Sequence, residues 1–340
     1  MFQIIFQIII FISLVSFTYC KPLAHIQDSD ILSTLINLSD PTQVNSMEQL
    51  ETNMIAIKTI FGDLENKRGF VDPRGAFPTI YQVTTSKGLQ KIISSENGEG
   101  PFNNPSMVRC FALQFGKLYL KNLHGHLTNG PVSEGWSTYY KMATSPKIHI
   151  LQIMGAGANV HINLDLTTAL QTCEAPKTFL KDFMQAGKPL VQEIPKMAKD
   201  LQTIYDIDPK LTYGLFKMYF IGTAGDLIFK LFNFKGNTSS AIFQTLRWMG
   251  FKNHKSLTRL HNPKWYTVIP HAREALLRKK MRTIWKASNF VLNKWIHIAH
   301  TKSVNEAENS LNHIFKDAIK NIGFNLFKKQ KNSQSLIGLD

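Results

Sequence analysis

Cysteine is scarce in this chain, with three among 340 residues. Cys20 ends an apolar N-terminal segment, so only Cys110 and Cys173 belong to the main body. Two cysteines cannot hold together a body of this size, which excludes a disulfide framework and requires a hydrophobic core. They can form one bridge in an oxidising compartment, or pack as two buried thiols. The sequence does not decide between these alternatives.

The sequence motifs of several common enzyme classes are also missing. The chain has no H-E-x-x-H, no C-x-x-C, no G-x-S-x-G and no phosphate-binding P-loop. These absences exclude standard forms of the zinc-protease helix, the redox or zinc cysteine pair, the α/β-hydrolase nucleophile and the P-loop nucleotide site. Strand signals are rare as well, because no Asn-Gly or Asp-Gly turn separates alternating apolar runs.

Charge is absent from residues 1–17, which read MFQIIFQIIIFISLVSF. An apolar segment of this kind, followed by small or polar residues, is typical of a secretory signal peptide. We predict a signal peptide over residues 1–20 and a protein that is secreted, periplasmic or otherwise extracytoplasmic. The alternative is an uncleaved membrane anchor formed by residues 1–19, although roughly 17 apolar residues are only marginally long enough to span a bilayer.

The rest of the chain has a helical pattern nearly throughout. Helix-start signals of the N-cap and capping-box types occur at Ser46–Gln49, Asn104-Pro105, Ser145-Pro146 and Ser303–Glu306. Loops are expected at about 63–77, 95–105, 124–135 and 252–267, while the apolar segment 213–234 contains Lys217, Asp226 and Lys230, which favours a core helix over a membrane span. We predict an all-α fold, a multi-helix bundle, with a single helical domain over 21–327 and a mobile basic tail over 328–340.

Positive charge is concentrated toward the C-terminus. Residues 251–340 contain 17 Lys and Arg but 5 Asp and Glu, which places +12 of the net charge of +15 in the last 90 residues. A helix predicted over 272–299 has basic residues in its first half and an apolar side that includes Trp285 and Trp295. Such a helix can bind an anionic lipid or membrane surface, or it can pack on the core with its charges in water. Nucleic acid is disfavoured as a partner by the export signal.

The stretch GAGANVHINLDLTTAL, residues 155–170, has the composition of a buried helix but carries four polar residues at every second position. At 100° per residue, His161 and Asp165 lie about 40° apart on one face, and Asn159 and Asn163 lie on roughly the opposite face. We therefore predict two polar stripes on a buried helix, each requiring partners from neighbouring helices. The glycines of this stretch are expected to permit close contact between helices.

Five segments together resemble the uncharacterised family catalogued as domain of unknown function 5995, over roughly residues 105–300. They are Phe115–Leu120, Trp136, Pro146–Gln152, Gly157–Leu166 and Arg282–Ala287. The hallmark is a helix of the form Asn-x-His-Ile-Asn-x-Asp-Leu. The resemblance implies a mostly helical fold and no established activity. A member of the family would be expected to have Asn near the position of Gly187, so the site of this chain is expected to be modified there.

The His161/Asp165 pair allows three interpretations. Both side chains can bind one divalent metal ion, zinc, manganese or iron, with further ligands from His124 and His126. Alternatively, His161 can act as a base that Asp165 orients, with Asn159 and Asn163 supporting either site. The third interpretation is a buried structural hydrogen bond. Other candidate metal ligands are Asp226 and His271.

These observations lead to two functional hypotheses. The first is an exported hydrolase, metal-assisted, that acts on an anionic or lipid-like substrate at His161 and Asp165. The second is a non-enzymatic protein that binds a membrane surface or a lipid, with a structural His–Asp pair.

Overall fold

The computed structural model describes residues 28–65, 69–187, 192–216, 241–260, 270–307 and 309–310. All regular secondary structure within these residues is helical, as predicted. The α-helices are α2 (Ser29–Ser39), α3 (Met47–Phe61), α4 (Ala76–Glu96), α5 (Pro105–Leu127), α6 (Glu134–Ala143), α7 (Ile150–Val160), α8 (Leu166–Thr172), α9 (Leu180–Gln185), α11 (Ile194–Tyr205), α12 (Pro209–Phe216), α14 (Ala241–Leu260) and α15 (Pro270–Thr301). Short turns of other helix types are η1 (Pro73–Gly75), η2 (His161–Asp165) and η3 (Lys177–Phe179).

Several predictions fall on residues outside this description. They concern the signal peptide over 1–20, the tail over 328–340, the part of the apolar segment that contains Asp226 and Lys230, and the side chain of the candidate metal ligand His271. Among the described helices, none is both long and apolar enough to cross a bilayer.

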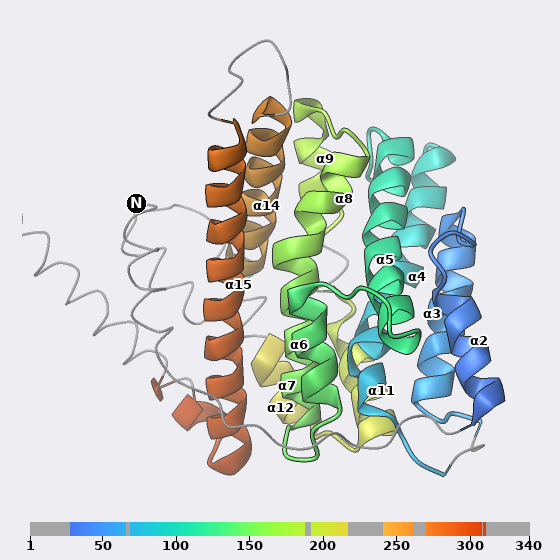
Figure 1. Cartoon of the computed structure of the whole chain (residues 1–340), viewed down its shortest axis with the longest axis vertical. Helices are drawn as coiled ribbons and strands as arrows, with labels where there is room; N and C mark the ends of the chain where they lie inside the picture. Colours follow the sequence, from blue (N-terminus) through green and yellow to red (C-terminus); the bar gives the residue numbers. More distant parts are fainter. Residues whose placement is uncertain are drawn as a thin grey trace, which may run out of the picture.

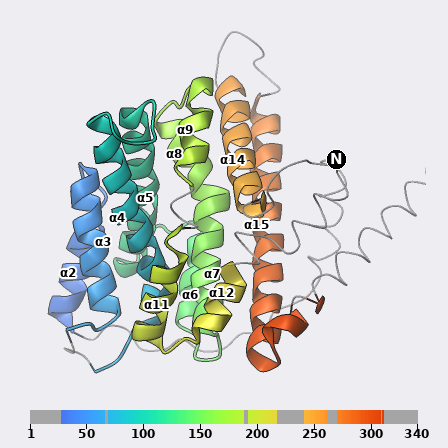
Figure 2. The same cartoon turned by 180° about the vertical axis from the view of Figure 1, so that it is seen from behind.

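The long helices lie side by side with their axes roughly aligned (Figure 1). Helices α2 and α3 form one edge, α4 and α5 come next, α6 to α9 occupy the middle, and α14 and α15 form the opposite edge. From behind, α11 and α12 are seen in front of the lower part of the bundle (Figure 2). One continuous hydrophobic core extends from Leu35 in α2 to Ala307 after α15, so every layer contributes to the same interior.

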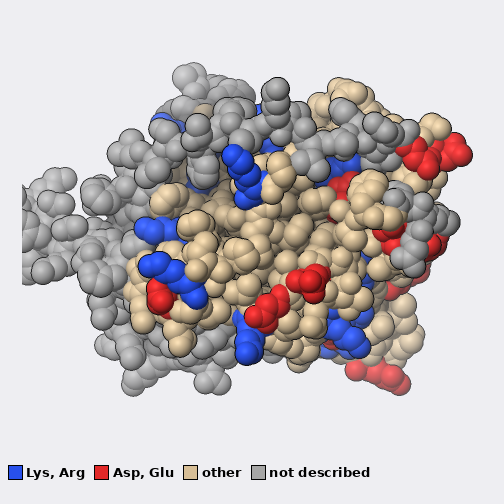
Figure 3. All heavy atoms as spheres, turned by 90° about the horizontal axis from the view of Figure 1, so that it is seen from below, with Lys and Arg blue, Asp and Glu red and all other residues tan. Residues whose placement is uncertain are grey.

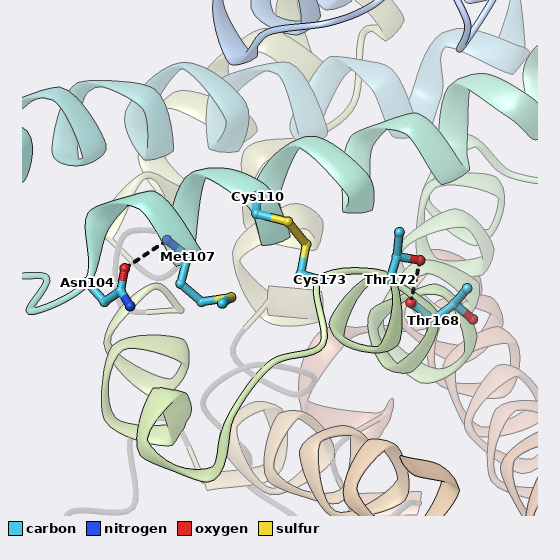
Figure 4. The surroundings of a disulfide bond; sticks show 6 residues. All are labelled: Asn104, Met107, Cys110, Thr168, Thr172 and Cys173. Atoms are coloured by element: carbon cyan, nitrogen blue, oxygen red, sulfur yellow. Dashed lines mark hydrogen bonds between the residues drawn. A yellow bond between two sulfur atoms is a disulfide. The ribbon is translucent and has the colours of Figure 1, made fainter. Parts of the chain in front are cut away.

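Three of the predicted helix starts are confirmed, among them Ser303, whose Oγ accepts a hydrogen bond from the Glu306 amide ahead of a helical segment over 304–307. Ser46 Oγ accepts a hydrogen bond from the Gln49 amide, and the Gln49 side chain accepts one from the Ser46 amide, so the capping box forms and α3 follows it. Asn104 Oδ1 accepts a hydrogen bond from the Met107 amide at the start of α5 (Figure 4). In all three cases a side-chain oxygen satisfies an amide that the first helical turn leaves without a partner.

Two local predictions are wrong. Ser145-Pro146 does not begin a helix, because Ser145 lies in the turn that closes α6, where its amide donates to Met142 O. The cap of α7 is instead His149, whose Nδ1 accepts from the Leu151 amide. The loop expected from residue 252 is helical as far as Leu260. There the buried side chains recur at helical spacing and the polar residues between them face water.

Helix α15 confirms the packing alternative for the basic helix. Met281, Trp285 and Trp295 are buried against the core. On the other side, Arg282 and Lys286 are exposed and approach Glu134 of α6 at 3.6 and 2.8 Å. Seen from below, the surface shows basic and acidic side chains interspersed (Figure 3). Binding of α15 to an anionic membrane stays a prediction.

Cys110 and Cys173 form a disulfide bond, which decides between the two alternatives that the sequence left open. The bridge joins the first half of α5 to the residue that follows α8, 63 positions later in the chain (Figure 4). The bridge therefore holds the C-terminal end of the polar segment 155–170 close to α5.

Replacement of both cysteines by serine should lower the free energy of unfolding by about 2–4 kcal/mol, because the unfolded chain regains the entropy that a long closed loop removes. Urea denaturation of the double variant and of the parent, with and without reductant, measures this effect. The parent with reductant and the variant without reductant should unfold at similar urea concentrations, because neither contains the bridge. A parent in which Cys110 and Cys173 both react with a thiol reagent after denaturation without reductant would contradict the bridge.

Candidate functional site

The polar stretch lies where α7 passes into α8. Between the two helices, residues His161–Asp165 form one π-helical turn, η2, in which the Leu166 amide donates to His161 O. The hydrogen bonds of a π turn span one residue more than those of an α-helix, and such turns are frequent at functional sites. His161 forms a hydrogen bond with Asp165, and Asn159 forms one with Asn163. Both residue pairs predicted from helical spacing are therefore present despite the π turn.

Asp165 lies at the centre of the first pair. Its Oδ2 atom is 2.9 Å from His161 Nδ1 and also accepts a hydrogen bond from Trp136 Nε1 of α6 at 2.8 Å. The His161 and Asp165 side chains are 3% and 10% exposed. A neutral imidazole that donates from Nδ1 has its lone pair on Nε2. That Nε2 atom is buried and has no hydrogen-bond partner among the residues that the structure describes.

Aromatic rings enclose His161. Phe115 of α5 stacks on the imidazole with ring centroids 3.5 Å apart. Tyr81 and Phe77 of α4 meet it edge-on at 4.7 and 5.3 Å. Burial lowers the pKa of His161, and the hydrogen bond and charge of Asp165 only partly oppose this effect. The imidazole is therefore neutral at pH 7, as both a base and a structural donor require.

Asn159 and Asn163 connect helices. Asn163 Nδ2 donates to Asn159 Oδ1 at 2.8 Å, and Asn159 Nδ2 donates to the carbonyl oxygen of Trp285 in α15 at 2.9 Å. The close helix contact expected from the glycines is found at Gly157, where an added Cβ would lie 2.7 Å from Phe77 Cβ. At Gly155 the nearest atom would be 3.8 Å away, so glycine is not required there.

His124 and His126 have other surroundings. His124 Nδ1 lies 3.1 Å from Ile36 O in α2, and the His126 ring stacks on Tyr140 at 4.0 Å. The described part of the chain contains no group of three or more His, Cys, Asp or Glu side chains placed to bind one metal ion. The structure thus brings His161 and Asp165 together but does not add His124 and His126 to them.

A cavity of about 100 Å³ lies beside this site. It is lined mainly by apolar and aromatic side chains of α4 and α5, and it is bounded by Ile162 of η2 and Leu166 of α8. Tyr81 and Phe115 belong both to the cavity wall and to the rings around His161. Sequence reasoning missed this cavity. One signal for it was Gly88, an isolated glycine within a long helix.

Arg247 of α14 contributes a buried cation to the same cavity wall. Its guanidinium lies over the Phe183 ring, 4.4 Å from the centroid, and donates to the carbonyl oxygens of Phe183 and Met184 at the end of α9. Burial lowers the pKa of Arg247 to about 9. A Cβ added to Gly187 would overlap the guanidinium, so an Asn at position 187 and Arg247 in this position exclude each other.

Two substitutions of Asp165 distinguish the contribution of its hydrogen bonds to stability from the contribution of its negative charge. Asp165→Ala leaves two buried N–H donors without an acceptor and should cost about 3 kcal/mol of unfolding free energy or more. Asp165→Asn can present one oxygen to both donors and should cost about 1 kcal/mol. Chemical denaturation of the three proteins at pH 7 measures the difference. An Asp165→Ala variant as stable as the parent would show that the pair does not stabilise the fold.

The comparisons with known proteins identify a family but no function. No curated protein and no solved structure matches the chain significantly. A family model described as "Family of unknown function (DUF5995)" matches residues 55–224. The match includes the hallmark helix. It covers residues 55–224, whereas the resemblance in the sequence covered roughly 105–300, so the similar segment Arg282–Ala287 lies outside the match. The chain belongs to this family of unknown function.

Proposed function

We propose that this protein is an exported binding protein for a lipid-like ligand, and that the cavity between α4 and α5 takes up a compact apolar part of that ligand. The cavity is the observation that carries this proposal. An engineered apolar cavity of about 150 Å³ binds benzene. A cavity of about 100 Å³ lined in this way is of the same order. It suits an aromatic ring or a short stretch of alkyl chain.

Gly88 supports a binding role for the cavity. A glycine inside a helix costs roughly 0.5–1 kcal/mol relative to alanine. Gly88 lies well inside α4 and lines the cavity, and a Cβ added there would meet no atom within 4 Å. An alanine would therefore fit without a clash and would stabilise the helix. Glycine at this position gives up that stability and leaves the space open.

Two features support export. The uncharged apolar segment at residues 1–17 resembles a signal peptide. The Cys110–Cys173 bridge joins α5 to the residue that follows α8, and disulfides persist mainly in oxidising compartments outside the cytosol. The binding role and the site are independent of this assignment.

A large side chain at position 88 should fill the cavity and weaken ligand binding. In calorimetric titrations with octan-1-ol, the parent should bind, and Gly88→Leu should bind at least tenfold more weakly. Gly88→Ala serves as the control. It should bind like the parent and should be more stable by up to about 1 kcal/mol. Equal binding by all three proteins, or no binding by the parent, would contradict the proposal.

Hydrolysis is the second candidate, and the buried Nε2 atom of His161 is the observation that favours it. Asp165 fixes the imidazole with Nδ1 protonated, so Nε2 is the basic nitrogen, as in a base held by an orienting carboxylate. Nε2 is also the His161 atom that would bind a metal ion. However, Asp165 Oδ2 already accepts two hydrogen bonds, which suits an orienting role for Asp165 better than metal ligation. The metal-assisted form stays a prediction.

The hydrolase hypothesis predicts that His161→Gln lowers the rate of ester or phosphoester cleavage by about 10²–10⁴-fold, the usual contribution of a general base. Nitrophenyl octanoate and nitrophenyl phosphate are suitable substrates, and elemental analysis of the same samples tests for zinc, manganese or iron. Circular dichroism should show the variant folded. A parent without activity on either ester and without metal would leave the His161–Asp165 pair as a structural element.

A further inference from the structure

The cavity has a polar end and an apolar end. Because the residues of α4 that line it recur at helical spacing, one stripe of that helix faces the space. The stripe consists of Tyr81, Thr84, Thr85, Gly88 and Ile92. The three residues with hydroxyl groups come first, beside His161, whose ring Tyr81 meets edge-on. Ile92 lies roughly 16 Å beyond Tyr81 along the helix axis. A ligand in this space therefore meets hydroxyl groups at one end and mainly hydrocarbon along the rest.

The hydroxyl protons at the polar end are already used within the protein. Thr85 Oγ1 lies 2.9 Å from the main-chain carbonyl oxygen of Tyr81. A carbonyl oxygen can only accept, so the Thr85 proton points to it. Thr84 Oγ1 donates in the same way to the Ile80 carbonyl oxygen at 3.3 Å. The Tyr81 hydroxyl forms a hydrogen bond with the Thr85 side chain. Since the Thr85 proton is engaged elsewhere, Tyr81 is the donor of that bond.

The oxygen atoms at this end can still accept hydrogen bonds. A hydroxyl oxygen has two acceptor lone pairs, and within the described residues no N–H or O–H group donates to the Tyr81 hydroxyl oxygen. Burial raises the pKa of Tyr81, and the charge of Asp165 adds to this effect, so the phenol keeps its proton at pH 7. Arg247, the charged residue of the wall, donates from its terminal nitrogens to the carbonyl oxygens of Phe183 and Met184. The polar end thus presents acceptors to the cavity.

We infer that the ligand of this cavity is an alcohol, whose hydroxyl donates to the Tyr81 hydroxyl oxygen and whose apolar part lies along Gly88 toward Ile92. This inference rests on the proposed binding function and adds to it the functional group of the ligand. A buried acceptor without a donor is costly, and a ligand O–H group removes that cost. An ether or ketone would instead place a second acceptor against the first.

The test compares octan-1-ol with its isomer 1-methoxyheptane, which contains the same atoms but has no O–H group. In calorimetric titrations at pH 7, the parent should bind octan-1-ol at least fivefold more tightly than the ether. Because the two probes have the same composition and similar size, this ratio measures the hydrogen bond that the ligand donates.

Two variants should reduce the ratio in opposite ways. Tyr81→Phe keeps the ring that packs on His161 but removes the acceptor, so octan-1-ol affinity should fall about three- to tenfold, while ether affinity changes less than twofold. Thr85→Val keeps the shape of the side chain but releases the Tyr81 proton. That proton can then be donated to an ether oxygen, so ether affinity should rise at least threefold.

Matched controls exclude effects of the substitutions themselves. Tyr213→Phe removes the hydroxyl of an exposed tyrosine of α12. Thr52→Val removes a hydroxyl that donates to the Glu48 carbonyl oxygen on the exposed side of α3, the same kind of bond that Thr85 makes. Neither control should change the affinity for either probe by as much as twofold.

The outcomes separate this inference from the binding function. If the parent binds both probes equally, the inference is overturned and the binding function stands. If the parent binds neither probe, the binding function itself fails. A preference for the alcohol that persists unchanged in Tyr81→Phe overturns the role of Tyr81. If circular dichroism shows that Tyr81→Phe does not fold, the ratio in the parent and the rise in ether affinity in Thr85→Val give the decision.

Discussion

One oxygen atom organises the centre of this protein. Asp165 Oδ2 accepts hydrogen bonds from Trp136 of α6 and from His161 one turn earlier in its own chain segment. Because both donors are buried among aromatic rings, neither can exchange this acceptor for water. The two bonds therefore fix the position of α6 against η2, the tautomer of His161 and the direction of Nε2 at once. Tyr81 and Phe115, which line the cavity, pack on the same imidazole. The two hydrogen bonds therefore also determine the shape of the cavity.

Binding and catalysis make different demands on this centre. A binding protein needs His161 and Asp165 as fixed supports behind Tyr81 and Phe115, and their burial suits that role. A hydrolase needs a path from substrate to Nε2, which lies behind those same rings. We propose binding for this reason, and in that proposal the His–Asp pair has the structural role that the sequence also allowed.

Local features were predictable from the sequence, and features formed by several helices were not. The pairing of His161 with Asp165 follows from helical spacing alone, and the caps at Ser46 and Asn104 follow from the chemistry of the first helical turn. The Trp136 bond joins residues 29 positions apart, and the cavity needs side chains from α3, α4, α5, α8 and α14. No periodicity in one segment contains that information. The start of α7 was missed because an imidazole nitrogen replaces the more usual hydroxyl or carboxylate as its cap.

The π turn has a consequence for which changes of length this chain can accept. It amounts to one residue inserted into a continuous helix, and each residue turns a helix by 100°. Deletion of one residue between 161 and 165 would restore a regular α-helix, but it would rotate everything after it. Leu166 would leave the cavity wall, and Cys173 would turn away from Cys110. Insertions and deletions in this stretch are therefore constrained by the disulfide and by the cavity together, although the stretch contains neither cysteine.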